Sequence, residues 1–192
     1  MRYFIGGISG VGKSTFVRSV VARQPNRFQA VHVAGAFMDF LGFDKDYEKL
    51  RSLPDDIRDE RLFACINELI EKNPGESLFD FHYLNIVRGK MTRLTGPWLS
   101  DFDALILITA DSREIVRRIM ADPAMRDRAL FKRDLSPDEM TERMNAYARA
   151  EKHEFTRVAR KYRKPHLIIN KDGDDRPVAE FLEFDKKIRN GK

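Results

Sequence analysis

Eight residues near the start of the chain have the types and spacing that phosphate binding requires. Residues 7–14 read G-I-S-G-V-G-K-S, which is a glycine, four residues, a glycine, a lysine and a serine. Glycines let the backbone wrap its N–H groups around phosphate oxygens, and a helix that begins there adds its positive end. The Lys13 ammonium can reach the β- and γ-phosphates, and the Ser14 hydroxyl can coordinate Mg²⁺. The pattern therefore predicts a Mg-ATP site formed by Gly7, Ser9, Gly10, Val11, Gly12, Lys13, Ser14 and Thr15.

A carboxylate at the end of a later apolar run suits the same chemistry. Asp80 ends the run S-L-F-D, in the arrangement of an aspartate that holds magnesium or its water shell. His82 lies two residues further on, so in a strand it points to the same side as Asp80. A hydrogen-bonded histidine at the end of a strand and a histidine that works on substrate both fit this position. We expect Ser14 and Asp80 to hold the metal, and we count His82 among the substrate-binding residues.

Basic residues gather in a segment with turn character and little apolar content. They are Arg117, Arg118, Arg126, Arg128, Lys132 and Arg133. One interpretation is a solvated charged loop. The other is a lid over residues 121–136 that closes on the transferring phosphoryl group, stabilises its spread charge and excludes water. We favour the lid, with Arg126, Arg128 and Arg133 as catalytic residues beside Lys13.

The elements that must position these residues follow from the hydrophobic pattern. Short apolar runs predict strands over residues 3–8, 30–34, 77–81, 104–109 and 166–170. Apolar stripes predict helices over 13–23, 55–72, 111–120 and 177–188, a long helix that begins at 136, and irregular helix over 37–53. A long loop is expected between the third and fourth strands. This alternation predicts one α/β domain over residues 1–192, with a five-stranded, mostly parallel sheet and helices on both of its faces.

Composition narrows the possible settings and partners. The 192 residues include 35 Lys and Arg against 30 Asp and Glu, a net charge of +5. No apolar run approaches the roughly 20 residues of a membrane span, and no apolar signal region precedes the first strand, so we expect a cytoplasmic protein. Cys65 is the sole cysteine, which excludes an intramolecular disulfide. A basic excess suits nucleic acid, but phosphate handling explains the arginine cluster better. We expect a small-molecule acceptor and no membrane or nucleic-acid partner, and the sequence does not indicate an oligomeric state.

Several short motifs follow the phosphate loop in a fixed order. They are G-x-F-M at 35–38, D-x-H at 80–82, R-x-R at 126–128, S-P-D-E at 136–139, A-R at 148–149 and I-N-x-x-G-D at 169–174. With these motifs, nearly the whole chain resembles the P-loop nucleoside monophosphate kinases, in particular the short-lid adenylate kinases of the archaeal type. The resemblance implies the P-loop NTPase three-layer fold, an acceptor-binding insertion over residues 35–72 and a short lid. It also implies transfer of the γ-phosphoryl group of ATP to AMP.

The resemblance assigns roles to individual residues as well. It places the acceptor nucleotide between residues 35–72 and the loop after His82, with its phosphate on Arg51 or Arg58. Arg118, at the lid entrance, would stack on the donor base, and the loop after the last strand would touch that base too. The residues so implied are Gly35, Phe37, Arg51, Arg58, His82 and Arg149 for the acceptor, and Arg118, Asn170, Lys171 and Gly173 for the donor.

Two other functions stay open. A P-loop kinase of a small hydroxyl metabolite, such as a sugar acid or a shikimate-like compound, would place an aspartate near the acceptor, and Asp39 or Asp80 could serve. A nucleotide-dependent switch or assembly ATPase would instead act on a protein or RNA. The run Asn170-Lys171-Asp172 resembles part of a guanine-reading motif, but that motif needs an aspartate where Gly173 stands, which disfavours a GTPase.

Overall fold

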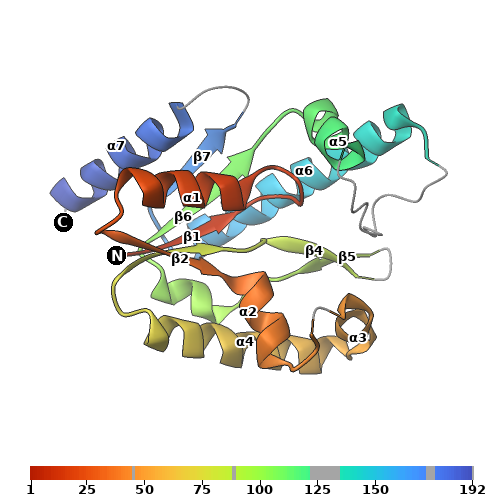
Figure 1. Ribbon diagram of the computed structural model, residues 1–192, viewed down its shortest axis with the longest axis horizontal. Coiled ribbons are helices and arrows are strands. Elements are labelled where there is room, and N and C mark those ends of the chain that lie inside the picture. The colour runs from red at the N-terminus through yellow and green to blue at the C-terminus, as the bar shows by residue number, and fades with distance from the viewer. Residues whose placement is uncertain (45, 88–89, 122–134, 172–175, 192) are drawn as a thin grey trace.

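A five-stranded sheet runs through the middle of the protein (Figure 1). The computed structural model describes residues 1–191 except 45, 88–89, 122–134 and 172–175. The strands of the sheet are β1 (Arg2–Gly6), β2 (Phe28–His32), β3 (Glu76–Asp80), β6 (Ala104–Thr109) and β7 (His166–Asn170). Their order is β2-β3-β1-β6-β7, and every neighbouring pair is parallel. The predicted five-stranded parallel sheet is therefore confirmed.

The central strand β1 brings the two predicted phosphate-site segments together. It lies between β3 and β6, with Ile5 in register with Asp80 on one side and with Ile106 on the other. Strands β1 and β6 are buried along nearly their whole length, as expected for parallel strands that helices cover on both faces. Because parallel strands end at the same edge of a sheet, the loop after β1 and the carboxylate of Asp80 lie side by side.

Helices cover both faces of the sheet (Figure 1). They are α1 (Lys13–Arg23), α2 (Val33–Phe40), α3 (Tyr47–Ser52), α4 (Asp55–Lys72), α5 (Ser112–Met120), α6 (Pro137–Lys161) and α7 (Arg176–Asn190). Since successive residues of a strand point to opposite faces, Tyr3 and Phe4 belong to two separate cores. Tyr3 packs with α1 and α7 through Phe16 and Phe181, whereas Phe4 shares the second core with Ile66 of α4 and its neighbours.

The segment between β3 and β6 differs from the prediction. Instead of a long loop, it contains an antiparallel hairpin, β4 (Leu84–Val87) with β5 (Lys90–Arg93), and a 3₁₀ helix, η1 (Pro97–Asp101). Strands of four residues are too short to give a periodic signal, and a lone hairpin is marginally stable in water. Packing against α6 stabilises this one: the Tyr147 hydroxyl donates a hydrogen bond of 2.7 Å to Leu84 O.

The segment between β2 and α4 also differs in detail. Strand β2 ends at His32, two residues earlier than predicted, because Val33 and Ala34 begin α2. The irregular helix predicted over 37–53 is two short helices, α2 and α3, on either side of Gly42. The Asp46 carboxylate starts α3 by accepting hydrogen bonds from the N–H groups of Glu48 and Lys49. Helix α2 packs against both α4 and β3, and α3 leads into α4 (Figure 1).

Helix α6 begins with a complete capping box. The Ser136 hydroxyl accepts from the N–H of Glu139, and the Glu139 carboxylate accepts from the N–H of Ser136. This fixes where the chain re-enters regular structure after the predicted lid, most of which lies outside the described residues. Within the part of the chain that is described, the helices include none long and apolar enough to cross a membrane.

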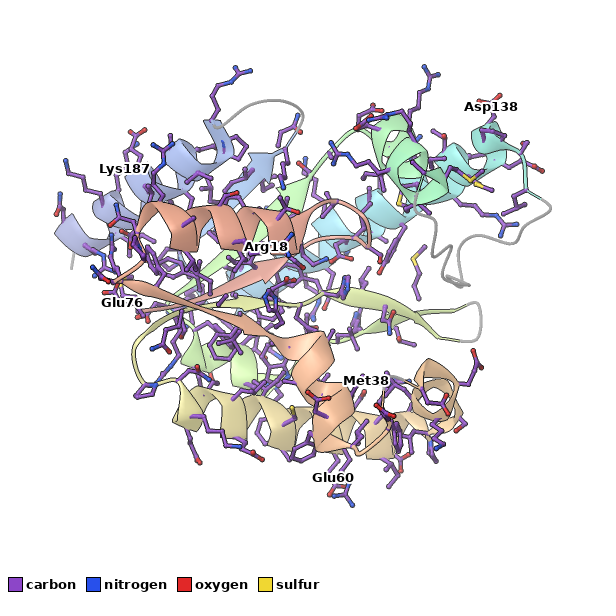
Figure 2. The ribbon with its side chains drawn as sticks, in the orientation of Figure 1. Arg18, Met38, Glu60, Glu76, Asp138 and Lys187 are labelled. Atoms are coloured by element: carbon purple, nitrogen blue, oxygen red, sulfur yellow. The ribbon has the colours of Figure 1, made fainter. Side chains whose placement is uncertain are left out.

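A buried carboxylate, Asp185, connects α7 to the end of the sheet where the strands begin, which for β3 is at Glu76 (Figure 2). Asp185 accepts hydrogen bonds from Tyr3, Arg27 and Arg189, the last at 2.9 Å. Both arginines also pair with Glu76, at 2.8 and 2.7 Å. Burial raises the pKa of Asp185, but the three hydrogen bonds outweigh it and the pKa lies below its usual value. This network stabilises the end of the sheet furthest from the phosphate loop.

Candidate active site

The phosphate loop joins the end of β1 to the start of α1. Gly12 is the N-cap of α1 and has a φ of +96° in the left-handed region, where residues with a Cβ are strained. A Cβ at Gly12 would also lie 2.9 Å from Nζ of Lys171. Having no side chain, Gly12 cannot cap the first N–H groups of α1, so these groups can bind an anion. The loop therefore has the backbone shape that its sequence predicts.

Lys13 is buried at the base of this loop. Its ammonium donates hydrogen bonds to Gly7 O at 2.9 Å and to Ile8 O at 3.2 Å, and lies 3.5 Å from Nδ1 of His82. That ring nitrogen is itself 2.8 Å from Gly7 O, an acceptor, so it donates in this contact. His82 thus supports the phosphate loop, as a hydrogen-bonded histidine at the end of a strand would. Its contact with a substrate stays a prediction.

The other predicted P-loop residues lie where the motif places them. The Val11 side chain is buried in the core, so its backbone N–H is the group that can meet a phosphate. Thr15 is exposed on the first turn of α1, where its hydroxyl accepts a 3.4 Å hydrogen bond from Arg18. Ser9 and Gly10 are half-buried in the loop itself. Backbone groups and short polar side chains therefore line the loop.

Two oxygen atoms converge at the predicted metal position. The Ser14 hydroxyl donates to Oδ2 of Asp80 at 2.6 Å. Hard oxygen donors of this kind suit Mg²⁺, which usually takes one or two protein ligands and completes its shell with water and phosphate oxygens. The residues present therefore fit a magnesium ion bound together with a nucleotide.

A histidine that the sequence did not single out also reaches this position. Nδ1 of His32 lies 3.2 Å from the same Oδ2 of Asp80. His32 ends β2 and is in register with Asp80 on β3. Only the pairing of β2 with β3 could have revealed this contact, because it is the register of the two strands that brings His32 opposite Asp80.

Three cations lie on the outer side of the phosphate loop. The Lys171 ammonium donates to Gly12 O at 2.9 Å. Burial lowers the pKa of Lys171, and the nearby charges of Arg118 and Arg18 lower it further. Arg118 is partly held by Glu114, which accepts from its Nε at 2.8 Å. Lys171 and Arg118 are therefore near the loop on the predicted donor side, and their contact with a donor base stays a prediction.

Other predicted donor and lid residues are only partly placed. Asn170 ends β7 in register with Thr109, beside the same edge of the sheet. Outside the described residues lie Arg126, Arg128, Arg133 and Gly173.

The predicted acceptor residues are scattered over α2, α3, α4 and α6. Phe37 packs in the core, and Arg58 is 3% exposed with ion pairs to Asp55 and Asp59 at 2.9 and 3.4 Å. Gly35 lies exposed in α2 and Arg149 exposed on α6, while the side chain of Arg51 is outside the described part of the chain. The structure thus gives Phe37 and Arg58 contacts inside the protein, and acceptor binding by this set stays a prediction.

A second residue that the sequence did not single out lies behind the loop. Glu151 of α6 is 1% exposed, and its Oε1 accepts a 3.0 Å hydrogen bond from the N–H of Tyr83. Burial raises its pKa to about 7, opposed by the Tyr83 N–H, the Lys13 charge and the N–H groups of Leu84 and Gly7. Its signal in the sequence is an acidic residue on the buried face of a long helix.

The strand order and the glycine loop after the central strand define the α/β fold of P-loop nucleoside triphosphate-binding proteins. Among solved structures, the crystal structure of a shikimate kinase from Bacteroides thetaiotaomicron has this fold, with a TM-score of 0.67 and 14% sequence identity. The match covers 99% of this chain and 98% of that chain. No protein-family model matches the sequence, and no curated protein matches it. The fold is therefore established, whereas no comparison supports particular closeness to archaeal-type adenylate kinases.

Proposed function

We propose that this protein is a Mg-ATP-dependent phosphotransferase that moves the γ-phosphoryl group of ATP onto a small-molecule acceptor. The observation that carries the proposal is the convergence of Lys13, Ser14 and Asp80. They meet where two central strands end, beside a glycine loop and a helix N-terminus. These are the parts that phosphoryl transfer needs, since it depends on positioning and on neutralising charge rather than on covalent chemistry.

Each part has a distinct role in this proposal. Backbone N–H groups of the loop and of the first turn of α1 bind the phosphates. Lys13 moves from its backbone carbonyls to the β- and γ-phosphates and stabilises the charge of the transferring group. Ser14 and Asp80 would hold Mg²⁺, which would neutralise phosphate charge. Arg126, Arg128 and Arg133 of the lid would add positive charge around the transferring group and exclude water.

Two classes of acceptor each have one observation in their favour. The shared fold with a shikimate kinase supports a small hydroxyl metabolite. The order of the motifs along the chain supports a nucleoside monophosphate, with AMP first. The comparisons favour the hydroxyl metabolite, and the test below separates the two classes.

The test is ADP formation from Mg-ATP by the purified protein with each acceptor in turn. The panel contains shikimate, several sugar acids, AMP, GMP, CMP, UMP and a control without acceptor. Lys13→Ala is assayed in parallel and should lose turnover by at least about 10²-fold, since it removes a charge that acts on the transferring group. The matched control is Lys187→Ala, an exposed lysine on α7 (Figure 2), which should keep wild-type turnover.

The outcomes are distinct. ADP formation that depends on one acceptor, and that Lys13→Ala abolishes, supports the proposal and identifies the acceptor class. Slow ATP loss that no acceptor changes contradicts it and favours a switch or assembly ATPase. Full turnover by Lys13→Ala contradicts the mechanism.

A further inference from the structure

Two carboxylates lie on the buried face of α6, where apolar side chains would be expected. Glu151 is 1% exposed and Glu154 is 2% exposed. Glu154 is neutralised by arginines, since Arg157 and Arg93 lie 2.6 and 3.2 Å from its oxygens. The cation that acts on Glu151 is Lys13, the lysine of the phosphate loop. Glu151 therefore differs from Glu154 in that its charge interacts with the lysine of the phosphate loop, whereas the charge of Glu154 is paired with two arginines.

Glu151 fixes the backbone directly after the active-site strand. Its Oε1 accepts a hydrogen bond from the N–H of Tyr83 at 3.0 Å. Its Oε2 is buried, and among the described residues no donor meets the distance and angle of a hydrogen bond to it. Tyr83 is completely buried, and its hydroxyl donates to Ile106 O at 3.1 Å. Both ends of Tyr83 are therefore held, the backbone by α6 and the side chain by β6.

Tyr83 follows His82, and His82 touches the phosphate loop. Nδ1 of His82 and Nζ of Lys13 both lie within hydrogen-bond distance of Gly7 O, at 2.8 and 2.9 Å. A continuous set of contacts thus leads from Glu151 through Tyr83 and His82 to Lys13. Helix α6 begins at Pro137, directly after the segment predicted as a lid.

We propose that Glu151 is a positioning residue for phosphoryl transfer, which holds His82 and Lys13 in place through its hydrogen bond to the Tyr83 N–H. The inference rests on the proposed function. The role assigned to Glu151 is that of a hydrogen-bond acceptor, since its Oε1 lies 3.0 Å from the Tyr83 nitrogen. Glutamine keeps an oxygen at the position of Oε1, so it should accept the same hydrogen bond from the Tyr83 N–H and preserve the function of Glu151.

Three variants separate positioning from stability: Glu151→Ala, Glu151→Gln and the matched control Glu154→Ala. Glu151→Ala should lower kcat about tenfold and weaken Mg-AMPPNP binding about fivefold, because small displacements of catalytic groups are costly. Its KM for the acceptor should stay within about twofold, and Glu151→Gln should return both values to within about twofold of wild type. Glu154→Ala loses ion pairs to Arg157 and Arg93 and should lower Tm while leaving kcat and Mg-AMPPNP binding unchanged.

Turnover, calorimetric titration with Mg-AMPPNP and thermal melting are measured for all three variants. The inference is overturned if Glu151→Ala matches Glu154→Ala in kcat and nucleotide affinity, because the role is then structural. It is also overturned if Glu151→Gln is as impaired as Glu151→Ala. If the wild-type protein transfers no phosphoryl group to any acceptor, the proposed function fails, and the Mg-AMPPNP affinities still decide the role of Glu151. If the wild-type protein does not bind Mg-AMPPNP, both fail.

Discussion

Replacing Gly6 by alanine would force a side chain into space that Tyr83 already fills. The added Cβ would lie 2.1 Å from Cε2 and 2.3 Å from Cδ2 of the Tyr83 ring, whereas carbon atoms in contact are normally about 3.5–4.0 Å apart. The ring must therefore move by more than about 1 Å. It has little freedom to do so, since it packs edge-on against Phe4 and Phe155 and its hydroxyl bonds Ile106 O.

The magnitude follows from these contacts. Overpacking a well-filled core costs about 1–3 kcal/mol, and losing the Tyr83 hydroxyl hydrogen bond adds about 1 kcal/mol. We expect Gly6→Ala to lower the free energy of unfolding by about 3 kcal/mol, which for a chain of this size lowers Tm by about 6–12 °C. Because His82 precedes Tyr83 and contacts Gly7, the displacement should also reduce kcat by about tenfold.

Thermal melting and steady-state turnover check both expectations. The matched control is Gly75→Ala, where the added Cβ would have Gln29 Nε2 as its nearest atom, at 3.8 Å. That change should stay within about 0.5 kcal/mol of wild type. Equal melting temperatures for Gly6→Ala and Gly75→Ala would refute the packing argument. A large loss of stability with wild-type kcat would refute the link from Tyr83 to the phosphate loop.

Three further predictions concern other contacts. Asp185→Ala should lower the free energy of unfolding by about 3 kcal/mol in urea denaturation at pH 7, whereas the exposed Glu183→Ala on the same helix should lower it far less; equal losses would contradict the network described above. The folded pKa of Asp185 lies below its usual value, so its contribution is present above about pH 4 and is lost as the pH falls through the folded pKa. The difference in the free energy of unfolding between wild type and Asp185→Ala should therefore become smaller in acid. A difference that grows in acid would contradict a lowered pKa for Asp185. Asp80→Asn should raise the Mg²⁺ concentration needed for half-maximal ATP turnover about tenfold, and an unchanged Mg²⁺ titration would remove Asp80 from the metal site.

Local sequence patterns predicted most of the fold and the residues at the centre of the site. The strands that became β1 and β6 are continuous apolar runs, which parallel strands between two helical layers require, whereas β3 and β7 have shorter apolar segments bounded by polar residues. Lys13 and Ser14 belong to a motif whose residues are adjacent in sequence, so the spacing alone predicts their arrangement. Asp80 was identifiable because it ends one of the apolar runs.

Contacts between distant segments could not be read in the same way. His32 meets Asp80 through the register of β2 and β3, and Glu151 meets Tyr83 across 68 residues of sequence. The hairpin β4–β5 depends on its packing against α6 rather than on its own pattern. Each of these features is decided by which surfaces pack together, and the spacing of residues along the chain does not contain that information.

Placing the phosphate loop on the central strand has a consequence for how the protein opens. Because β1 has hydrogen-bonded neighbours on both sides, the amides of β1, β3 and β6 should exchange with solvent only when the whole sheet unfolds. Helices α2 and α3 are short and lie outside the hydrogen-bonded sheet, so they should open at lower free energy. A nucleotide bound at Lys13 would then slow exchange in the sheet by mass action while leaving the local openings of α2 and α3 unchanged.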